Sequence, residues 1–192
     1  MLDTDFAIKL EKIQKINAIE QYIPKLVGKL SIHQYIYDNE ILTPKRIKEQ
    51  LNNLISQNKA VIVNTVFLKD DPIKTKIYRD TINHIENVDQ ETRINGKNWG
   101  ETVTLAYAFT QGISVVLSDE TDLQAMIDNE LNSGDENDIK VIRLRDFILG
   151  MKQLELSRKD AYQIWCLSHK KGLLDWAKRT FQEDLWPLNK KN

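Results

Sequence analysis

Short runs of β-branched and other apolar residues mark the strands expected in this chain. The clearest run covers residues 113–117, and a second covers residues 60–63. Apolar runs of this length without polar alternation are typical of strands buried on both faces, as in a parallel sheet. Shorter apolar stretches predict two further strands, at residues 30–32 and 139–144.

Between these strands, apolar residues recur at intervals of three and four and predict amphipathic helices. The expected helices cover residues 6–23, 43–57, 73–85, 100–109, 123–131 and 147–154. Gly112 suits the C-terminal end of one helix, and Ser118 is expected to cap the helix that follows it. Because strands and helices alternate, the pattern favours an α/β fold in which helices cover both faces of a parallel sheet.

From about residue 156 onward the pattern predicts helices alone. Ser157 with Asp160 resembles a capping box at the start of the first of them. Three of the four tryptophans fall in this region: Trp165, Trp176 and Trp186. We expect these tryptophans to pack on the main core. A contact with a partner or a second copy of the chain is the alternative, and stacking on nucleic-acid bases ranks last.

The composition is that of an ordinary globular protein and excludes several classes. The chain has 192 residues, is 41% hydrophobic and carries a formal net charge of −1. It has no apolar stretch long enough to span a membrane, and its N-terminus lacks the features of a secretory signal. The single cysteine, Cys166, excludes an internal disulfide and a zinc-finger site. These features predict no membrane partner and a cytoplasmic location.

Charge is distributed less evenly than the total suggests. Residues 119–138 contain eight acids and no lysine or arginine, whereas residues 151–192 contain nine basic and five acidic residues. An acidic centre with basic flanks could bind a metal ion and hold a polyanion nearby. Counts alone, however, favour ordinary solvated surface charge.

Any catalytic chemistry in this chain is expected to use carboxylates. The three histidines have no metal-ligand spacing, and Gly-rich phosphate loops and Gly-x-Ser-x-Gly motifs are absent. Acids do stand where strands or helices begin or end: Asp3, Glu101, Asp119 and Asp122. In a parallel sheet such ends can converge, and the converging carboxylates repel one another unless a divalent cation lies among them. Oxygen ligands of this kind suit Mg²⁺ or Mn²⁺.

Taken in order, three segments resemble the PIN-domain family of ribonucleases. They are Leu2-Asp3-Thr4, Gly100-Glu101 at the start of a helix, and the stretch Gly-Ile-Ser-Val-Val-Leu-Ser-Asp-Glu-Thr-Asp at residues 112–122. The resemblance covers about residues 1–150 and implies a three-layer α/β/α sandwich with a central parallel sheet. Residues 151–192 would form a helical C-terminal extension packed on that domain.

The resemblance also assigns individual acids as ligands of Mg²⁺ or Mn²⁺. Asp3 would be the ligand at the end of the first strand, and Glu101 the ligand carried by a helix. Asp119 and Asp122 would complete the catalytic cluster, and Glu40 looks like the family's auxiliary acid.

Two of these assignments have alternatives. Asp5 could replace Asp3, because only two residues precede Asp3 and the first strand would be unusually short. Glu120 could replace Asp119, because many family members have a second Asp at that position.

Two hydroxyl groups, those of Thr4 and Ser118, would orient the carboxylates by hydrogen bonding. Residues 64–98 match nothing in the family.

The resemblance implies a metal-dependent endoribonuclease that hydrolyses RNA phosphodiester bonds and leaves 5′-phosphate and 3′-hydroxyl ends. RNA is the expected partner. Two further partners are considered: an antitoxin protein, as in a toxin–antitoxin pair, and a second copy of the chain. One alternative is a catalytically inactive PIN-like module that binds a partner or RNA. A structure-specific DNA nuclease ranks last, because the chain has no obvious arch or helix–hairpin–helix element.

Overall fold

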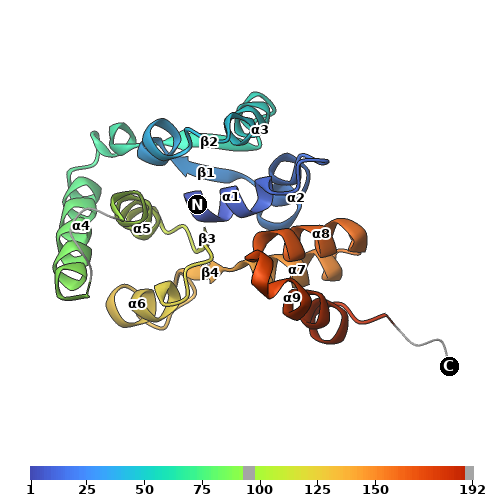
Figure 1. The fold of residues 1–192 in the computed structure, drawn as a ribbon. Helices are drawn as coiled ribbons and strands as arrows, with labels where there is room; N and C mark the ends of the chain where they lie inside the picture. Colours follow the sequence, from blue (N-terminus) through green and yellow to red (C-terminus); the bar gives the residue numbers. More distant parts are fainter. Residues whose placement is uncertain (93–97, 189–192) are drawn as a thin grey trace.

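The computed structural model describes residues 1–92 and 98–188 and has an α/β architecture (Figure 1). Its strands form two small parallel sheets, in which Leu30 lies opposite Ala60 and Val115 opposite Lys140. The first sheet pairs β1 (Leu30–His33) with β2 (Ala60–Val63), and the second pairs β3 (Val115–Leu117) with β4 (Lys140–Ile142). The four expected strands are therefore present and pair in parallel, although β3 and β4 are shorter than predicted.

The N-terminal segment links the two sheets through backbone hydrogen bonds on both of its sides. Leu2 N donates to Ser31 O of β1 over 3.2 Å, and Leu2 forms an isolated parallel bridge with Leu117 of β3. Leu117 N donates to Met1 O and Asp3 N donates to Leu117 O, each over 2.9 Å. The expected first strand is thus reduced to one bridge residue, and Asp3 lies where it ends.

Helices surround these strands (Figure 1). In the described part of the chain they are α1 (Thr4–Glu11), α2 (Ala18–Val27), α3 (Lys45–Ser56), α4 (Pro72–Thr92), α5 (Trp99–Gln111), α6 (Leu123–Glu130), α7 (Leu144–Gln153), α8 (Arg158–Ser168) and α9 (Leu174–Thr180). Short π-helical or 3₁₀ turns cover Ile36–Glu40, Thr65–Leu68, Lys171–Leu173 and Phe181–Leu185. None of the helices described here is both long enough and apolar enough to cross a membrane.

Side chains of the strand residues point alternately into two hydrophobic cores. Leu2 and Leu117 belong to the larger core, whereas their neighbours Met1 and Val116 belong to the smaller one. Helices α1, α2, α3, α7, α8 and α9 contribute to the larger core, and α4, α5 and α6 to the smaller one (Figure 1). Successive strand residues face opposite sides, so burial on both sides explains why most strand residues are apolar.

One expected helix is two helices in the structure. The stripe predicted as a helix over residues 6–23 forms α1 and α2, which are separated at residues 12–17. Arg46 of α3 stabilises this break by donating to Ile16 O and to the Asn17 side chain, each over 2.8 Å. The apolar spacing continues across the break, so it could not reveal a contact with a distant helix.

Gln50 of α3 joins the same two helices from a buried position, with 1% of its surface exposed. Its amide nitrogen donates to Glu11 Oε2 over 2.6 Å, and its amide oxygen accepts from Ile19 N over 3.0 Å. Arg46 also pairs with Glu11 at 3.1 Å. One side-chain amide therefore connects the end of α1 to the start of α2.

Two other expectations are wrong in detail. The strand predicted over residues 139–144 ends at Ile142, and Leu144 instead begins α7. Ser118 does not cap α6, because Asp122 occupies the N-cap position of that helix. Strand β4 ends earlier than the apolar pattern indicates, and α6 begins later than expected after β3.

Helix α8 packs against α1 and α7, and α9 packs on α8. Trp165 is 5% exposed, and its indole N–H donates to Ala177 O over 2.9 Å. Tyr22 of α2 donates to Asp160 of α8 over 2.6 Å. Trp176 departs from the expected core role, because it is 45% exposed.

We expect Gln50→Ala to lower the free energy of unfolding by about 2 to 3 kcal/mol, because it leaves a buried Glu11 oxygen and the Ile19 N–H unsatisfied. Urea denaturation of wild type and variant measures this difference. Glu49→Ala, at an exposed position of the same helix, is the control and should change stability by less than about 0.5 kcal/mol. Equal stabilities of the two variants would contradict the assigned role of Gln50.

Candidate functional site

Asp3 is the centre of the candidate site, at the junction of the N-terminal segment and α1. It is the N-cap of α1, and its Oδ1 accepts from Thr4 N over 2.7 Å. Its other oxygen, Oδ2, accepts from Ser118 Oγ over 3.0 Å. Ser118 directly follows β3, and the pairing of Leu2 with Leu117 brings the two residues together. The Ser118 hydroxyl thus donates to a carboxylate of the predicted site, as expected.

The Asp3 carboxyl group lies in an unfavourable place for a negative charge. Its pKa is raised from 3.8 to about 6, mainly by burial and to a smaller extent by the nearby carboxylates of Asp5 and Glu40. The hydrogen bonds from Ser118 and Thr4 lower the pKa but do not offset the burial. A cation or a proton at this position would relieve the unfavourable charge.

Glu40 lies beside Asp3 and against the start of α5. The Thr4 hydroxyl donates to Glu40 Oε2 over 2.5 Å, as expected for a residue that orients a carboxylate. A methyl group added at Gly100 would lie 2.1 Å from Glu40 Oε1, so the carboxylate packs directly on the glycine. The next residue, Glu101, is 8% exposed. The structure therefore brings Asp3, Glu40 and the Gly100–Glu101 turn together from three distant segments.

Asp119 contacts two basic side chains and the first backbone N–H of a helix. Its Oδ2 lies 2.6 Å from Lys9 Nζ of α1, and its Oδ1 accepts from Leu144 N, the first residue of α7, over 3.0 Å. Arg143 Nε lies 3.7 Å from the same Oδ1. These contacts hold Asp119 between α1 and α7, so its charge is compensated without a metal ion.

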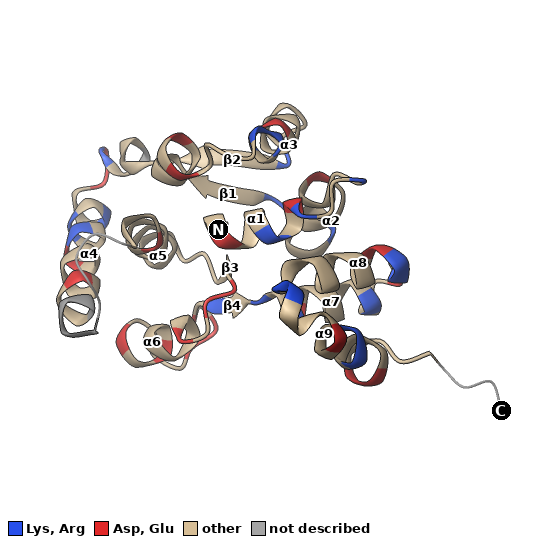
Figure 2. Ribbon diagram, viewed as in Figure 1, with Lys and Arg blue, Asp and Glu red and all other residues tan. Residues whose placement is uncertain are grey.

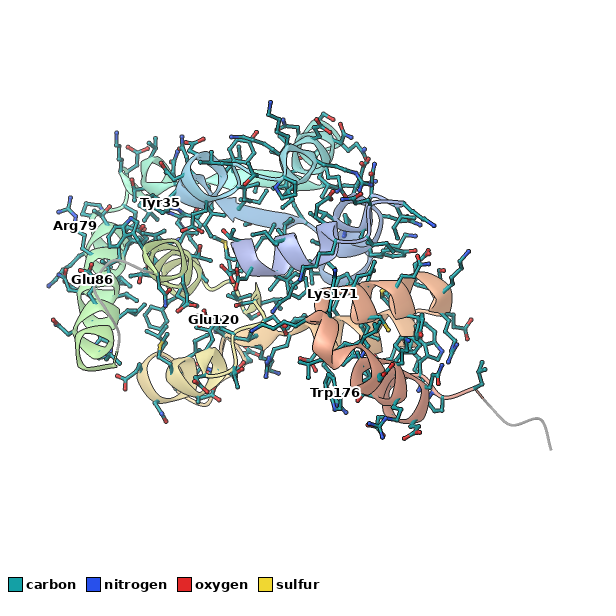
Figure 3. All side chains as sticks on the ribbon, viewed as in Figure 1. Tyr35, Arg79, Glu86, Glu120, Lys171 and Trp176 are labelled. Atoms are coloured by element: carbon teal, nitrogen blue, oxygen red, sulfur yellow. The ribbon has the colours of Figure 1, made fainter. Side chains whose placement is uncertain are left out.

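The other two predicted acids follow Asp119 in the loop after β3. Glu120, labelled in Figure 3, is partly buried, and its backbone N–H points to Ser118 Oγ at 3.4 Å. Asp122 is exposed at the N-cap position of α6, where its side chain makes no capping hydrogen bond. Figure 2 shows acidic residues at the start of α1 and in this loop, with basic residues at the start of α7 and ahead of α9.

Arg143 is a residue that the sequence reasoning missed. It directly follows β4, just as Asp119 follows β3 after Ser118, and so it lies near the carboxyl ends of neighbouring strands. The rule that functional groups gather at these ends applies to cations as well as to acids. Applied to β4, that rule would have identified Arg143.

The donor atoms around Asp3 suit Mg²⁺ or Mn²⁺, because they are carboxylate oxygens. Within residues 1–92 and 98–188, however, no group of three or more His, Cys, Asp or Glu side chains is arranged to hold a metal ion. Asp3 and Glu40 are linked through Thr4 rather than through a common ligand. The donors are therefore of the right chemical type but are not gathered in advance.

Comparison with known proteins leaves the chain without a match: no protein-family model, no curated protein and no solved structure resembles it significantly.

We expect Asp3→Asn to stabilise the protein at pH 7.5 by up to about 3 kcal/mol, because it removes a buried charge. Native Asp3, with its raised pKa, holds a proton more tightly than it does in the unfolded chain. Wild-type stability should therefore fall as pH rises from about 4 to 6, relative to Asp3→Asn. Thermal unfolding of both proteins across this range measures the difference.

Asp80→Asn, which removes an exposed carboxylate from α4, is the matched control and should follow the wild-type profile. If the stabilities of wild type and Asp3→Asn change with pH in the same way, burial does not raise the pKa of Asp3.

Proposed function

We propose that this chain is a Mg²⁺- or Mn²⁺-dependent endoribonuclease whose metal site is built on Asp3, Glu40 and Glu101. The observation that carries the proposal is the partly buried Asp3 carboxyl group, which lies beside Glu40 and forms no ion pair within residues 1–92 and 98–188. A divalent cation would be stabilised at this position, and phosphodiester hydrolysis at an acidic cluster uses such ions.

The backbone pairing supports a single central sheet of the PIN-like type. The N-terminal segment is hydrogen-bonded to β1 on one side and to β3 on the other. Together the pairings give the strand order β2, β1, N-terminal segment, β3, β4, with helices of the two cores on either side. In this arrangement Asp3 and Ser118 stand at the carboxyl ends of neighbouring central strands, where ligands bind in α/β folds.

Each residue of the site has a definite part in this proposal. Ser118 and Thr4 donate hydrogen bonds to the carboxylates of Asp3 and Glu40, and these acids would draw together around the ion when it binds. Glu101 adds a carboxylate at the start of α5, where the helix dipole stabilises its charge. The bound ion would polarise the scissile phosphate and lower the pKa of a water molecule.

Purified protein should cleave a mixed RNA pool with Mn²⁺ and not with EDTA, and Glu101→Gln should reduce the rate by about a hundredfold or more, because it removes a charged ligand. Gel analysis of the products measures the rate. Glu49→Gln, an exposed change on α3, controls for the loss of one acid and should retain full activity. Full activity of Glu101→Gln would refute the assignment of Glu101.

Gly100→Ala tests Glu40 without touching a charge. The added methyl group must displace the Glu40 carboxylate, which lies at the end of a flexible side chain, so we expect stability to change by less than about 1 kcal/mol. The cleavage rate should nevertheless fall by about tenfold or more, because a displacement of about 1 Å disturbs a catalytic geometry. Unchanged cleavage with unchanged stability would remove Glu40 from the site.

A second candidate function is a PIN-like module that binds RNA or a partner without cleaving. It is favoured by the contacts of Asp119, whose charge is already compensated by Lys9 and by the start of α7. Thermal unfolding with millimolar Mg²⁺ or Mn²⁺ separates the two functions. A rise in melting temperature that is absent in Glu101→Gln supports the nuclease, whereas no rise in the wild type supports the binding module.

A further inference from the structure

The end of α8 lies directly against α1, next to the acidic loop. Ser168 Oγ donates to Lys9 O over 3.2 Å, and Lys12 Nζ donates to Ser168 O over 3.2 Å. Lys9 in turn pairs with Asp119. A continuous series of contacts therefore leads from the loop after β3, through α1, to the residues that connect α8 to α9.

Basic side chains gather along this series of contacts and form what we call the basic edge: Lys9, Lys12, Arg143, Lys170 and Lys171. Lys9 and Arg143 lie against Asp119, whereas Lys170 and Lys171 are exposed and have no acidic partner within 4.0 Å in the described structure. Lys178 is not included, because it pairs with Asp175 at 3.5 Å. The basic edge starts at the candidate site and extends to the start of α9 (Figures 2 and 3).

An exposed indole stands at the outer end of the basic edge. Trp176 of α9 lies with its ring centroid 5.2 Å from that of His169 and 6.0 Å from that of Trp165. These two rings support Trp176 from within the protein, yet 45% of it remains exposed. Figure 3 labels Lys171 in the 3₁₀ turn that precedes α9 and Trp176 in α9 itself. A supported, exposed indole that follows two lysines by five and six residues provides a stacking surface for an unpaired base.

We propose that the basic edge and Trp176 bind a single-stranded segment of RNA that leads into the candidate site. Phosphates lie along Lys9, Lys170 and Lys171, and one base stacks on Trp176. The inference rests on the proposed function for the choice of RNA. Single strands are required because the bases of a duplex stack on one another and cannot reach the indole. This assigns a binding function to the C-terminal helices.

Binding can be measured without cleavage, by fluorescence anisotropy in EDTA. The probe is a labelled single-stranded RNA of roughly twelve nucleotides, within the site sizes of single-strand binders. We expect the wild type to bind this probe more tightly than the matching RNA duplex. Trp176→Ala should weaken binding about tenfold, and Trp176→Phe should restore most of it, because a smaller ring still stacks. Thermal unfolding checks that both variants remain folded.

The lysines are tested through the salt dependence of binding. Replacing both Lys170 and Lys171 by Gln removes two phosphate contacts, which should lower the slope of log Kd against log salt by about 1.4. The matched control replaces Lys76 and Arg79 of α4 by Gln. These exposed residues lie on α4, and Figure 3 shows Arg79 at the opposite end of the molecule from Trp176. The control should leave the slope unchanged.

The outcomes separate this inference from the proposed nuclease. If the wild-type protein binds single-stranded RNA through Trp176 but does not cleave it, the inference is supported and the proposed nuclease function is contradicted. If the protein cleaves RNA, but Trp176→Ala and the double lysine variant bind RNA with the affinity of the wild type, the inference is overturned and the proposed nuclease function stands. No binding of single-stranded RNA, or self-association that Trp176→Ala abolishes, also overturns it and makes this surface a protein interface. Equal affinity for single-stranded DNA and single-stranded RNA supports this binding surface but assigns it to single-stranded nucleic acids in general.

Discussion

The backbone hydrogen bonds of residues 1–3 are the constraint on which the rest of the structure depends. Leu2 is fully buried and bonded to β1 and β3, which have no other recorded pairing with each other in the described chain. This pairing sets the two sheets side by side and divides the apolar side chains between two cores. It also places Asp3 next to Ser118, so the same hydrogen bonds that organise the fold also assemble the candidate site.

Electrostatics divides the acids of the candidate site into two groups. Asp3 and Glu40 are close, partly buried and supported by hydroxyl groups, and burial together with the nearby carboxylates raises the pKa of Asp3. Asp119 has the opposite environment, since Lys9 and the N-terminus of α7 neutralise it. An acid that is already neutralised gains less from a metal ion than one that is not. The first group is therefore the better place for a cation.

Much of the candidate site could be predicted from the sequence because its supporting contacts lie beside strand and helix ends. The hydroxyls of Thr4 and Ser118 orient carboxylates as expected, and Glu40 lies against the predicted Gly100–Glu101 turn. The partners of Asp119 could not be predicted in this way. They come from α1 and α7, which are far from Asp119 in sequence, and no local pattern records their approach.

The sequence by itself determined the strands, the alternation of strands with helices, and the end of α5 at Gly112, which adopts the left-handed conformation that glycine favours. These features depend on local apolar spacing and backbone preference, which neighbouring residues express directly. Only the tertiary structure decided the break between α1 and α2, the exposure of Trp176 and the compensation of Asp119. Each of these depends on burial and pairing with residues distant in the chain, because the free energy of a polar or aromatic group is set by what finally surrounds it.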